Sequence, residues 1–136
     1  MTANPAFCIA SDPASMAARL MRDNDVGSIP VAEDRKSRRL VGIVTDRDIA
    51  LSIVAEDRDP RGTTVGDIMT PNPVTWRPDD DIQAALDAMK KNQLRRIPVV
   101  DGKGQLLGII AQADIAVHGA DSAKTAEVVA TVSQPA

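Results

Sequence analysis

The segment Gly42-Ile43-Val44-Thr45-Asp46-Arg47-Asp48 places a hydroxyl and a carboxylate close together at the end of an apolar stretch. The pattern predicts a strand that runs into the start of a helix. The first N–H groups of a helix lack intrahelical partners, so a threonine hydroxyl beside them suits a phosphate group. Asp48, one turn further on, can accept bonds from neighbouring hydroxyls. The same spacing also fits a capping box, in which Thr45 and Asp48 bond only the helix N-terminus.

The chain contains an internal repeat, which is the first feature to seek in a sequence. Met1-Thr2-Ala3-Asn4-Pro5 matches Met69-Thr70-Pro71-Asn72-Pro73 at a shift of 68 residues, and Ile29-Pro30-Val31 matches Ile97-Pro98-Val99 at the same shift. After a loop that is two residues longer in the first copy, Leu40–Ile43 pairs with Leu106–Ile109. These ordered matches indicate two copies of one structural unit.

The two copies differ at the positions that could bind an anion. The second copy keeps Asp114 where the first has Asp48, but Ala111 stands where the first has Thr45. Asp114 is therefore either a weaker ligand-binding residue or a simple helix-start residue.

Arg95 and Arg96 precede the second Ile-Pro-Val, where the first copy has Gly27-Ser28. The planar guanidinium group makes bidentate contacts with phosphate. The alternative is a solvated charge pair next to Lys90 and Lys91.

Each copy predicts the order strand, helix, strand, strand, helix. Short extended segments follow each Asn-Pro, at Ala6–Ile9 and Val74–Arg77. We expect Asp12 to cap the first helix with Pro13 at its first position. The predicted helix stripes contain Met16, Leu20, Met21, Ile82, Leu86 and Met89. Strands are expected at Leu40–Val44 and Leu106–Ile110, and final helices at Asp46–Ala55 and Gln112–Val117. The predicted domains are residues 1–55, a linker at 56–64, residues 65–118 and a tail at 119–136.

The composition argues against several classes of function. Phe7 and Trp76 are the only aromatic residues, and the net charge is -3, so stacking on single-stranded nucleic acid and general phosphate-backbone binding are disfavoured. Cys8 is the only cysteine, which excludes an intramolecular disulfide and a cysteine-based zinc site. The sequence has no apolar run of about 20 residues and no signal peptide, so we expect a cytoplasmic protein without a membrane partner.

The repeated motifs Met-Thr-x-Asn-Pro and Ile-Pro-Val, with Leu-Val-Gly-Ile-Val-Thr-Asp-Arg-Asp-Ile, together resemble the CBS domain. The resemblance covers about residues 1–118, and the chain looks most like the free-standing bacterial CBS-pair proteins called Bateman modules. It implies an α/β (α+β) fold of two βαββα repeats with pseudo-twofold symmetry, packed through their sheets, and a homodimer. Similar pairs regulate IMP dehydrogenase and AMP-activated kinase. A catalytic barrel of about 250 residues does not fit in this chain, so no enzyme activity is expected.

The resemblance also assigns roles to the candidate residues. CBS pairs that bind adenine nucleotides share a consecutive sequence pattern. In order, it consists of glycine, two apolar residues, serine or threonine, two variable residues and aspartate. Thr45 and Asp48 match this pattern, and Arg95 and Arg96 would reach the phosphates from the other repeat. Asp114 marks a second site that is empty or holds a nucleoside-like ligand.

The expected function is therefore the sensing of a regulatory adenine nucleotide or derivative, with no required cofactor and an unknown downstream protein. AMP, ADP, ATP, NAD and S-adenosylmethionine all remain candidates. The alternative is a ligand-free dimerisation or scaffold module.

Other side chains that could bind a ligand or metal are expected to be structural. His118 is predicted at a helix end, Cys8 in a strand, and Trp76 in a packing role. Asp79-Asp80-Asp81 is expected to open a helix rather than bind a metal.

Overall fold

The computed structural model describes residues 1–118, which divide into two compact units. Residues 6–73 form the N-terminal unit, and residues 1–5 together with 74–118 form the C-terminal unit. Within these described residues no helix is both long enough and apolar enough to cross a membrane.

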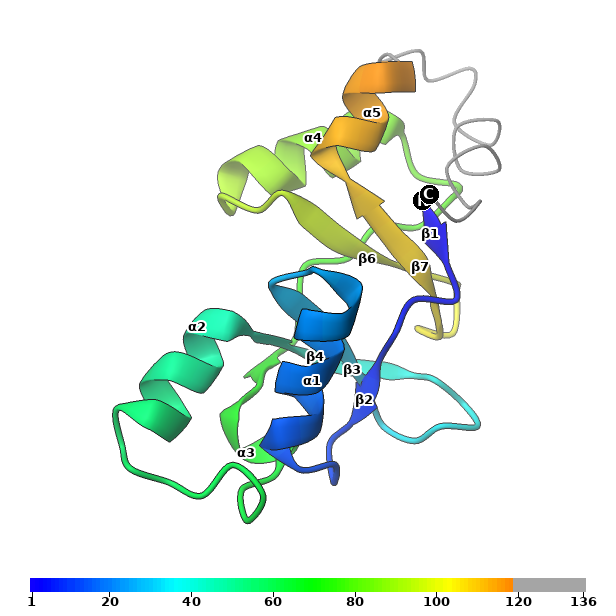
Figure 1. The fold of residues 1–136 in the computed structure, drawn as a ribbon. Coiled ribbons are helices and arrows are strands. Elements are labelled where there is room, and N and C mark those ends of the chain that lie inside the picture. The colour runs from blue at the N-terminus through cyan, green and yellow to red at the C-terminus, as the bar shows by residue number, and fades with distance from the viewer. Residues whose placement is uncertain (119–136) are drawn as a thin grey trace. The chain divides into compact units, whose positions relative to one another are not determined.

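The N-terminal unit is a four-stranded sheet with helices packed against it (Figure 1). The strands lie in the order β2-β3-β4-β5, with β2 parallel to β3 and the other pairs antiparallel. Their bounds are β2 Cys8–Ile9, β3 Ser28–Ala32, β4 Leu40–Thr45 and β5 Thr70–Pro71. The helices are α1 Ala14–Asn24, α2 Asp46–Ile49, η1 Ala50–Val54 and α3 Val65–Ile68.

The C-terminal unit repeats this arrangement. Its sheet has the order β1-β7-β6, with β1 Thr2–Ala3, β6 Arg96–Val100 and β7 Leu106–Ala111. A parallel bridge between Trp76 and Val99 stands where β2 pairs with β3 in the other unit. The helices α4 Ile82–Lys91 and α5 Gln112–His118 pack on this sheet. The predicted mixed α/β fold is therefore confirmed.

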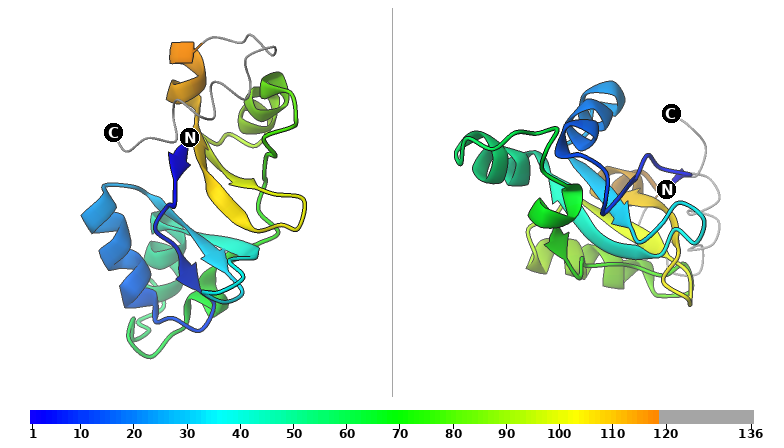
Figure 2. Two further views of the ribbon diagram at one scale, coloured as in Figure 1. Left: turned by 90° about the vertical axis from the view of Figure 1, so that its right-hand side faces the viewer. Right: turned by 90° about the horizontal axis from the view of Figure 1, so that it is seen from below.

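The Met-Thr-x-Asn-Pro segments form strands that sequence analysis did not anticipate. Thr2 of β1 lies opposite Ile109 of β7, and Pro71 of β5 lies opposite Gly42 of β4 (Figure 2, where β1 runs beside β7). Each sequence repeat thus contributes its first strand to the sheet of the other repeat. Asn4 and Asn72 follow with φ near 50°, a left-handed conformation in which asparagine is enriched.

Two glycines allow these exchanged strands to approach. A Cβ on Gly108 would lie 2.5 Å from the Thr2 carbonyl oxygen, and a Cβ on Gly42 would lie 2.5 Å from Met69 Sδ and 2.9 Å from the Thr70 carbonyl oxygen. The glycine of the Leu-Val-Gly-Ile motif is therefore required by the strand that crosses it.

Each unit has its own aliphatic core. Cys8, Ala17, Ile29, Val31 and Val44 are among the buried residues of the N-terminal core. In the C-terminal core, the predicted stripe residues Ile82 and Met89 pack with Trp76, Ile97, Val99 and Ile110. Met21 is also buried, and Met16, Leu20 and Leu86 are half-buried against these clusters, so the predicted helix faces are confirmed.

The predicted cap of the first helix is wrong. Helix α1 begins at Ala14, and its N-cap residue is Pro13, which makes no side-chain cap bond. The buried Asp12 carboxylate instead accepts bonds from Ile9 N at 3.0 Å and Arg35 Nη2 at 2.7 Å. The first amides of α1 find other acceptors, because Ala14 N–H donates to the Thr63 carbonyl at 2.8 Å.

Four other predicted elements differ in detail. The helix expected over Asp46–Ala55 changes after α2 into a π-helix, where Ala55 N–H donates to the Ala50 carbonyl at 2.9 Å. The segment Val74–Arg77 contributes only the Trp76 bridge. Strands β4 and β7 each run one residue beyond the prediction, to Thr45 and Ala111.

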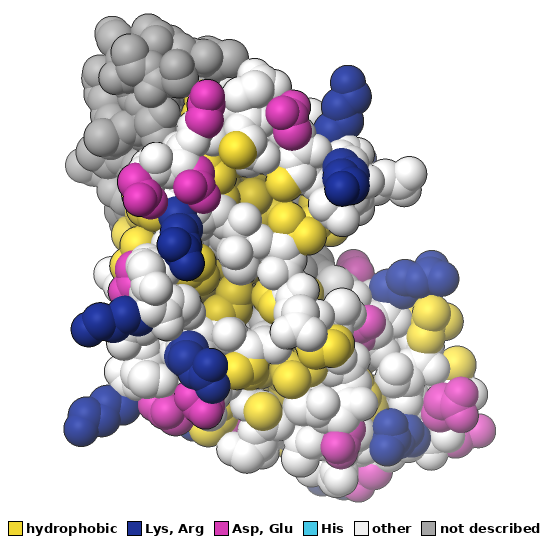
Figure 3. Space-filling view, turned by 180° about the vertical axis from the view of Figure 1, so that it is seen from behind, with side chains coloured by type: hydrophobic (Ala, Val, Ile, Leu, Met, Phe, Trp, Pro, Cys, Tyr) yellow, Lys and Arg dark blue, Asp and Glu magenta, His cyan; other side chains and the backbone are white. Residues whose placement is uncertain are grey.

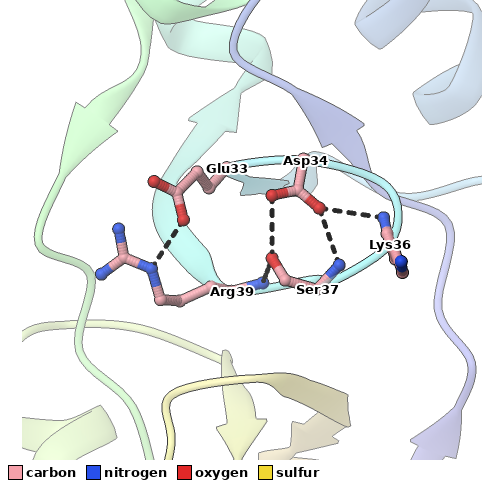
Figure 4. A network of polar contacts seen from close by, with 5 residues as sticks. All are labelled: Glu33, Asp34, Lys36, Ser37 and Arg39. Carbon is pink, nitrogen blue, oxygen red and sulfur yellow. Dashed lines mark hydrogen bonds and ion pairs between the residues drawn. The ribbon is translucent and has the colours of Figure 1, made fainter.

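Aspartates order both hairpin loops. Asp34 Oδ1 accepts from Lys36 N at 3.0 Å and Ser37 N at 2.7 Å, and Arg39 Nε donates to Glu33 at 2.8 Å (Figure 4). The Ser37 amide bond lowers the pKa of the exposed Asp34 carboxyl. In the second loop, Asp101 Oδ1 accepts from Lys103 N at 2.8 Å and from Gln105 N at 2.9 Å.

Charged side chains of both signs stand side by side on the face drawn in Figure 3, and basic and acidic groups are interspersed there. That face therefore lacks the single-sign field typical of a surface that binds a nucleic-acid backbone.

We predict that replacing Gly42 or Gly108 by alanine destabilises the protein. The new methyl group would collide with the exchanged strand, and overpacking of this kind costs about 1–3 kcal/mol. Gly102→Ala is the matched control, because nothing lies within 4 Å of its Cβ position. Chemical denaturation of Gly42→Ala, Gly108→Ala and Gly102→Ala measures the difference, and equal stability of all three would contradict the packing argument.

Cys8 should react only when the protein unfolds. Burial raises the pKa of its thiol to about 11, and the negative charge of Asp12 adds to the shift. At pH 8 the thiolate is therefore scarce and its sulfur is enclosed. A thiol-reactive disulfide reagent should label native protein slowly and denatured protein quickly. Rapid labelling of the folded protein would show that β2 opens easily.

Candidate functional site

The Thr45–Asp48 junction forms the reciprocal cap that its spacing allows. Thr45 Oγ1 accepts from Asp48 N at 3.0 Å, and Asp48 Oδ2 accepts from Thr45 N at 3.0 Å. Thr64 and Asp67 form the same arrangement at the start of α3. The capping interpretation of Thr45 and Asp48 is therefore correct as a description of the local structure.

The cap leaves part of both side chains available. The Thr45 hydroxyl accepts in the cap, so its own proton remains free to be donated. Within residues 1–118, Asp48 Oδ1 makes no hydrogen bond. Both residues are partly exposed. Capping and ligand binding are thus compatible at this junction.

The first amides of α2 do not fit the expectation that they are free for a phosphate. Asp46 N–H donates to the Gly27 carbonyl at 2.9 Å, Arg47 N–H to Asp46 Oδ1 at 2.8 Å, and Asp48 N–H to Thr45. That expectation was wrong, because neighbouring acceptors already satisfy these donors. An anion here would depend on the Thr45 hydroxyl and on basic side chains.

Thr70 joins this junction, and sequence analysis missed it. Its hydroxyl lies 3.5 Å from Asp48 Oδ2, because the exchanged strand β5 pairs with β4. The signal was present in the repeated Met-Thr-x-Asn-Pro motif. Its meaning depends on a pairing between distant segments.

Arg95 and Arg96 lie beside the corresponding junction of their own unit. Arg96 pairs with Ala111 across β6 and β7, and Gln112 N–H donates to the Arg95 carbonyl at 2.8 Å. Ile97 and its partner Ile110 belong to the core under α4. Because side chains alternate along a strand, Arg96, the first residue of β6, lies on the sheet face opposite Ile97. Arg95 lies just before the strand.

The same alternation applies in the N-terminal unit. Ser28 pairs with Thr45 one step beyond Ile29 and Val44, which are in the core. Thr45 and Arg96 therefore both lie on the sheet face that is turned away from the helix-packed core of their own unit.

Asp114 keeps half of the capping arrangement. Its Oδ2 accepts from Ala111 N at 3.1 Å, while Ala111 has no hydroxyl to complete the box. The structure thus brings Thr45, Asp48 and Thr70 together in one unit, and Arg95, Arg96 and Asp114 in the other.

Trp76 and Asp81 have structural roles. Trp76 is 2% exposed, and its Nε1 donates to the Asp81 carbonyl at 3.0 Å. Asp81 caps α4 by accepting from Gln83 N. Among residues 1–118, no three His, Cys, Asp or Glu side chains are grouped so that they could hold a metal ion.

Comparisons with known proteins agree with this architecture. A family model of the CBS domain matches residues 1–55 and 65–120. The CBS domain-containing protein YhcV of Bacillus subtilis is 41% identical over 102 residues, which cover 75% of this chain and 69% of that protein.

Two solved structures are similar in fold and sequence. A hypoxic response protein with two coordinated zinc ions has a TM-score of 0.77 and 33% identity, covering 88% of this chain and 94% of that one. CBSX2 of Arabidopsis thaliana in complex with AMP has a TM-score of 0.72 and 28% identity, covering 87% of this chain and 90% of that one. With both copies matched by the family model, this chain belongs to the CBS-domain family and carries a pair of such domains.

Proposed function

We propose that this CBS pair is a non-enzymatic sensor that binds an adenine nucleotide or derivative between its repeats. The observation that carries the proposal is the Thr45–Asp48 junction, where a hydroxyl proton and a carboxylate oxygen remain available after the helix is capped. Asp48 Oδ1 would accept from the ribose hydroxyls, and Thr45 would donate to a phosphate. CBSX2, a structural relative, was solved with AMP, which supports this ligand class.

Arginine from the other repeat would neutralise the phosphates. Arg95 and Arg96 make no ion pair with any residue of 1–118, so their charge is available. Arg96 is the better placed of the two, because it shares with Thr45 the sheet face turned away from the core of its own unit. AMP, ADP, ATP, NAD and S-adenosylmethionine all carry the adenosine group that Asp48 would recognise.

Occupancy would then be relayed to a downstream protein through the arrangement of the repeats or of a homodimer. Such a relay requires the ligand to bind two states of the protein with different affinity.

The second site, which is marked by Asp114, favours a different function from the first. Ala111 supplies no hydroxyl, and the first repeat has the uncharged Gly27 and Ser28 where the second repeat has its two arginines. A site of this kind suits an uncharged nucleoside or no ligand, as in a scaffold module.

We predict that Asp48→Ala weakens AMP binding far more than Asp114→Ala. The two aspartates make similar bonds to backbone amides, at 3.0 and 3.1 Å, so both substitutions should cost comparable stability. Only Asp48 has Thr45 and Thr70 beside it. Titration calorimetry with AMP, paired with thermal melts of both variants, separates stability from binding. Equal losses of affinity would refute the asymmetry between the sites.

Replacing both Arg95 and Arg96 by alanine should reduce the affinity for AMP at least about tenfold, because a charge-assisted bond contributes about 1.5–3 kcal/mol. Adenosine, which has no phosphate, should bind almost as before. Added salt should also reduce AMP affinity in the wild type, since the arginines are exposed. Titration calorimetry with both ligands makes the comparison.

Parallel losses for AMP and adenosine would mean that the arginines support the fold. A wild-type protein that binds none of the adenine ligands would favour the scaffold function.

A further inference from the structure

The C-terminal unit has a groove formed by α4, the turn that follows it and the first residue of α5. Its volume is about 550 Å³, which is within the usual range for small-molecule sites. Leu86, Met89 and Leu94 provide an apolar lining, and Lys90 and Arg95 provide positive charge. The other lining residues are Gln83, Asp87, Gln93 and Gln112.

The two neighbouring arginines lie in different places. Arg95 lines this groove together with Met89, which is 2% exposed and belongs to the core under α4. Arg96 pairs with Ala111 on the opposite face of the sheet. A single ligand on the Arg96 face would therefore not be held by both guanidinium groups in the same way.

The charges of the groove favour an anion. Lys90 and Arg95 make no ion pair with any residue in the part of the chain that the structure describes. Asp87 is the only acidic lining residue, and its Oδ1 accepts from Gln83 Nε2 at 3.0 Å. The lining thus carries a net positive charge of one, from two basic residues and one acidic residue.

The lining also favours a ligand with an apolar part. Leu94 is 38% exposed, and Leu86 is half-buried beside it in the groove. A fully hydrated inorganic anion would leave this apolar surface uncovered, whereas a short aliphatic chain would cover it. The amide side chains can satisfy the remaining oxygens of an anionic head group.

We propose that this groove is an additional binding site, separate from the sites at Thr45–Asp48 and at Asp114. It would bind a small amphipathic anion that has one carboxylate or phosphate group and a short aliphatic chain. Lys90 and Arg95 hold the anionic group, and Leu86, Met89 and Leu94 contact the chain. The proposal does not depend on nucleotide binding at Thr45 and Asp48.

Octanoate is a suitable probe, and octanamide is its uncharged counterpart. Two-dimensional amide NMR of the full chain should show saturable shifts for residues 86–95 with octanoate, and much weaker ones with octanamide. Arg95→Ala and Lys90→Ala should each reduce the affinity for octanoate about threefold to tenfold, as expected for partly exposed charges. Lys91→Ala is the matched control, because Lys91 is exposed but does not line the groove.

The same samples titrated with AMP distinguish the two sites. Lys90→Ala should reduce octanoate affinity and spare AMP, while Arg96→Ala should spare octanoate. If the protein binds octanoate but no nucleotide, this proposal survives and the nucleotide proposal fails. Unsaturable shifts, or equal effects of Lys90→Ala and Lys91→Ala, would show non-specific charge attraction and overturn the groove site.

Discussion

Each sheet is extended at one edge by a strand from the other sequence repeat. Strand β1 pairs with β7, and β5 pairs with β4, so neither repeat forms its complete sheet alone. Gly108 and Gly42 permit the approach, since a side chain at either position would collide with the incoming backbone. Pairing also covers edges that would otherwise present unpaired backbone groups. The same exchange brings Thr70 to Asp48, so the constraint that builds the sheets also shapes the candidate site.

The candidate site illustrates how a stabilising contact and a binding contact can share side chains. Thr45 and Asp48 hold the start of α2 through reciprocal bonds, and each retains one group that a ligand can use. The backbone amides that would ordinarily attract a phosphate are already bonded within the unit. In the proposed nucleotide site, a phosphate would therefore have to be held by side-chain charge. The first repeat has Gly27-Ser28 at the positions where the second has its two arginines.

The start of β6 separates two adjacent charges. Arg95 lies just before the strand and lines the groove beside α4, whereas Arg96 is the first residue of β6 and lies on the sheet face turned away from the core of its unit. The arginine beside the groove shares it with Lys90 and with apolar side chains of α4 and the following turn. Arg95 and Arg96 therefore lie on two different surfaces, although they are the same type of residue.

The sequence by itself determined the repeat, the helix faces and the junctions that carry Thr45, Asp48 and Asp114. These features are local, because apolar periodicity and capping spacing depend on residues only a few positions apart. Tertiary structure alone decided the exchanged strands, the pairing of Asp12 with Arg35 and the separation of Arg95 from Arg96. A two-residue strand has no detectable periodicity, and its partner lies far away along the chain, as Thr2 and Ile109 show. The partner of a charged or capping side chain likewise depends on which distant segment the fold brings beside it.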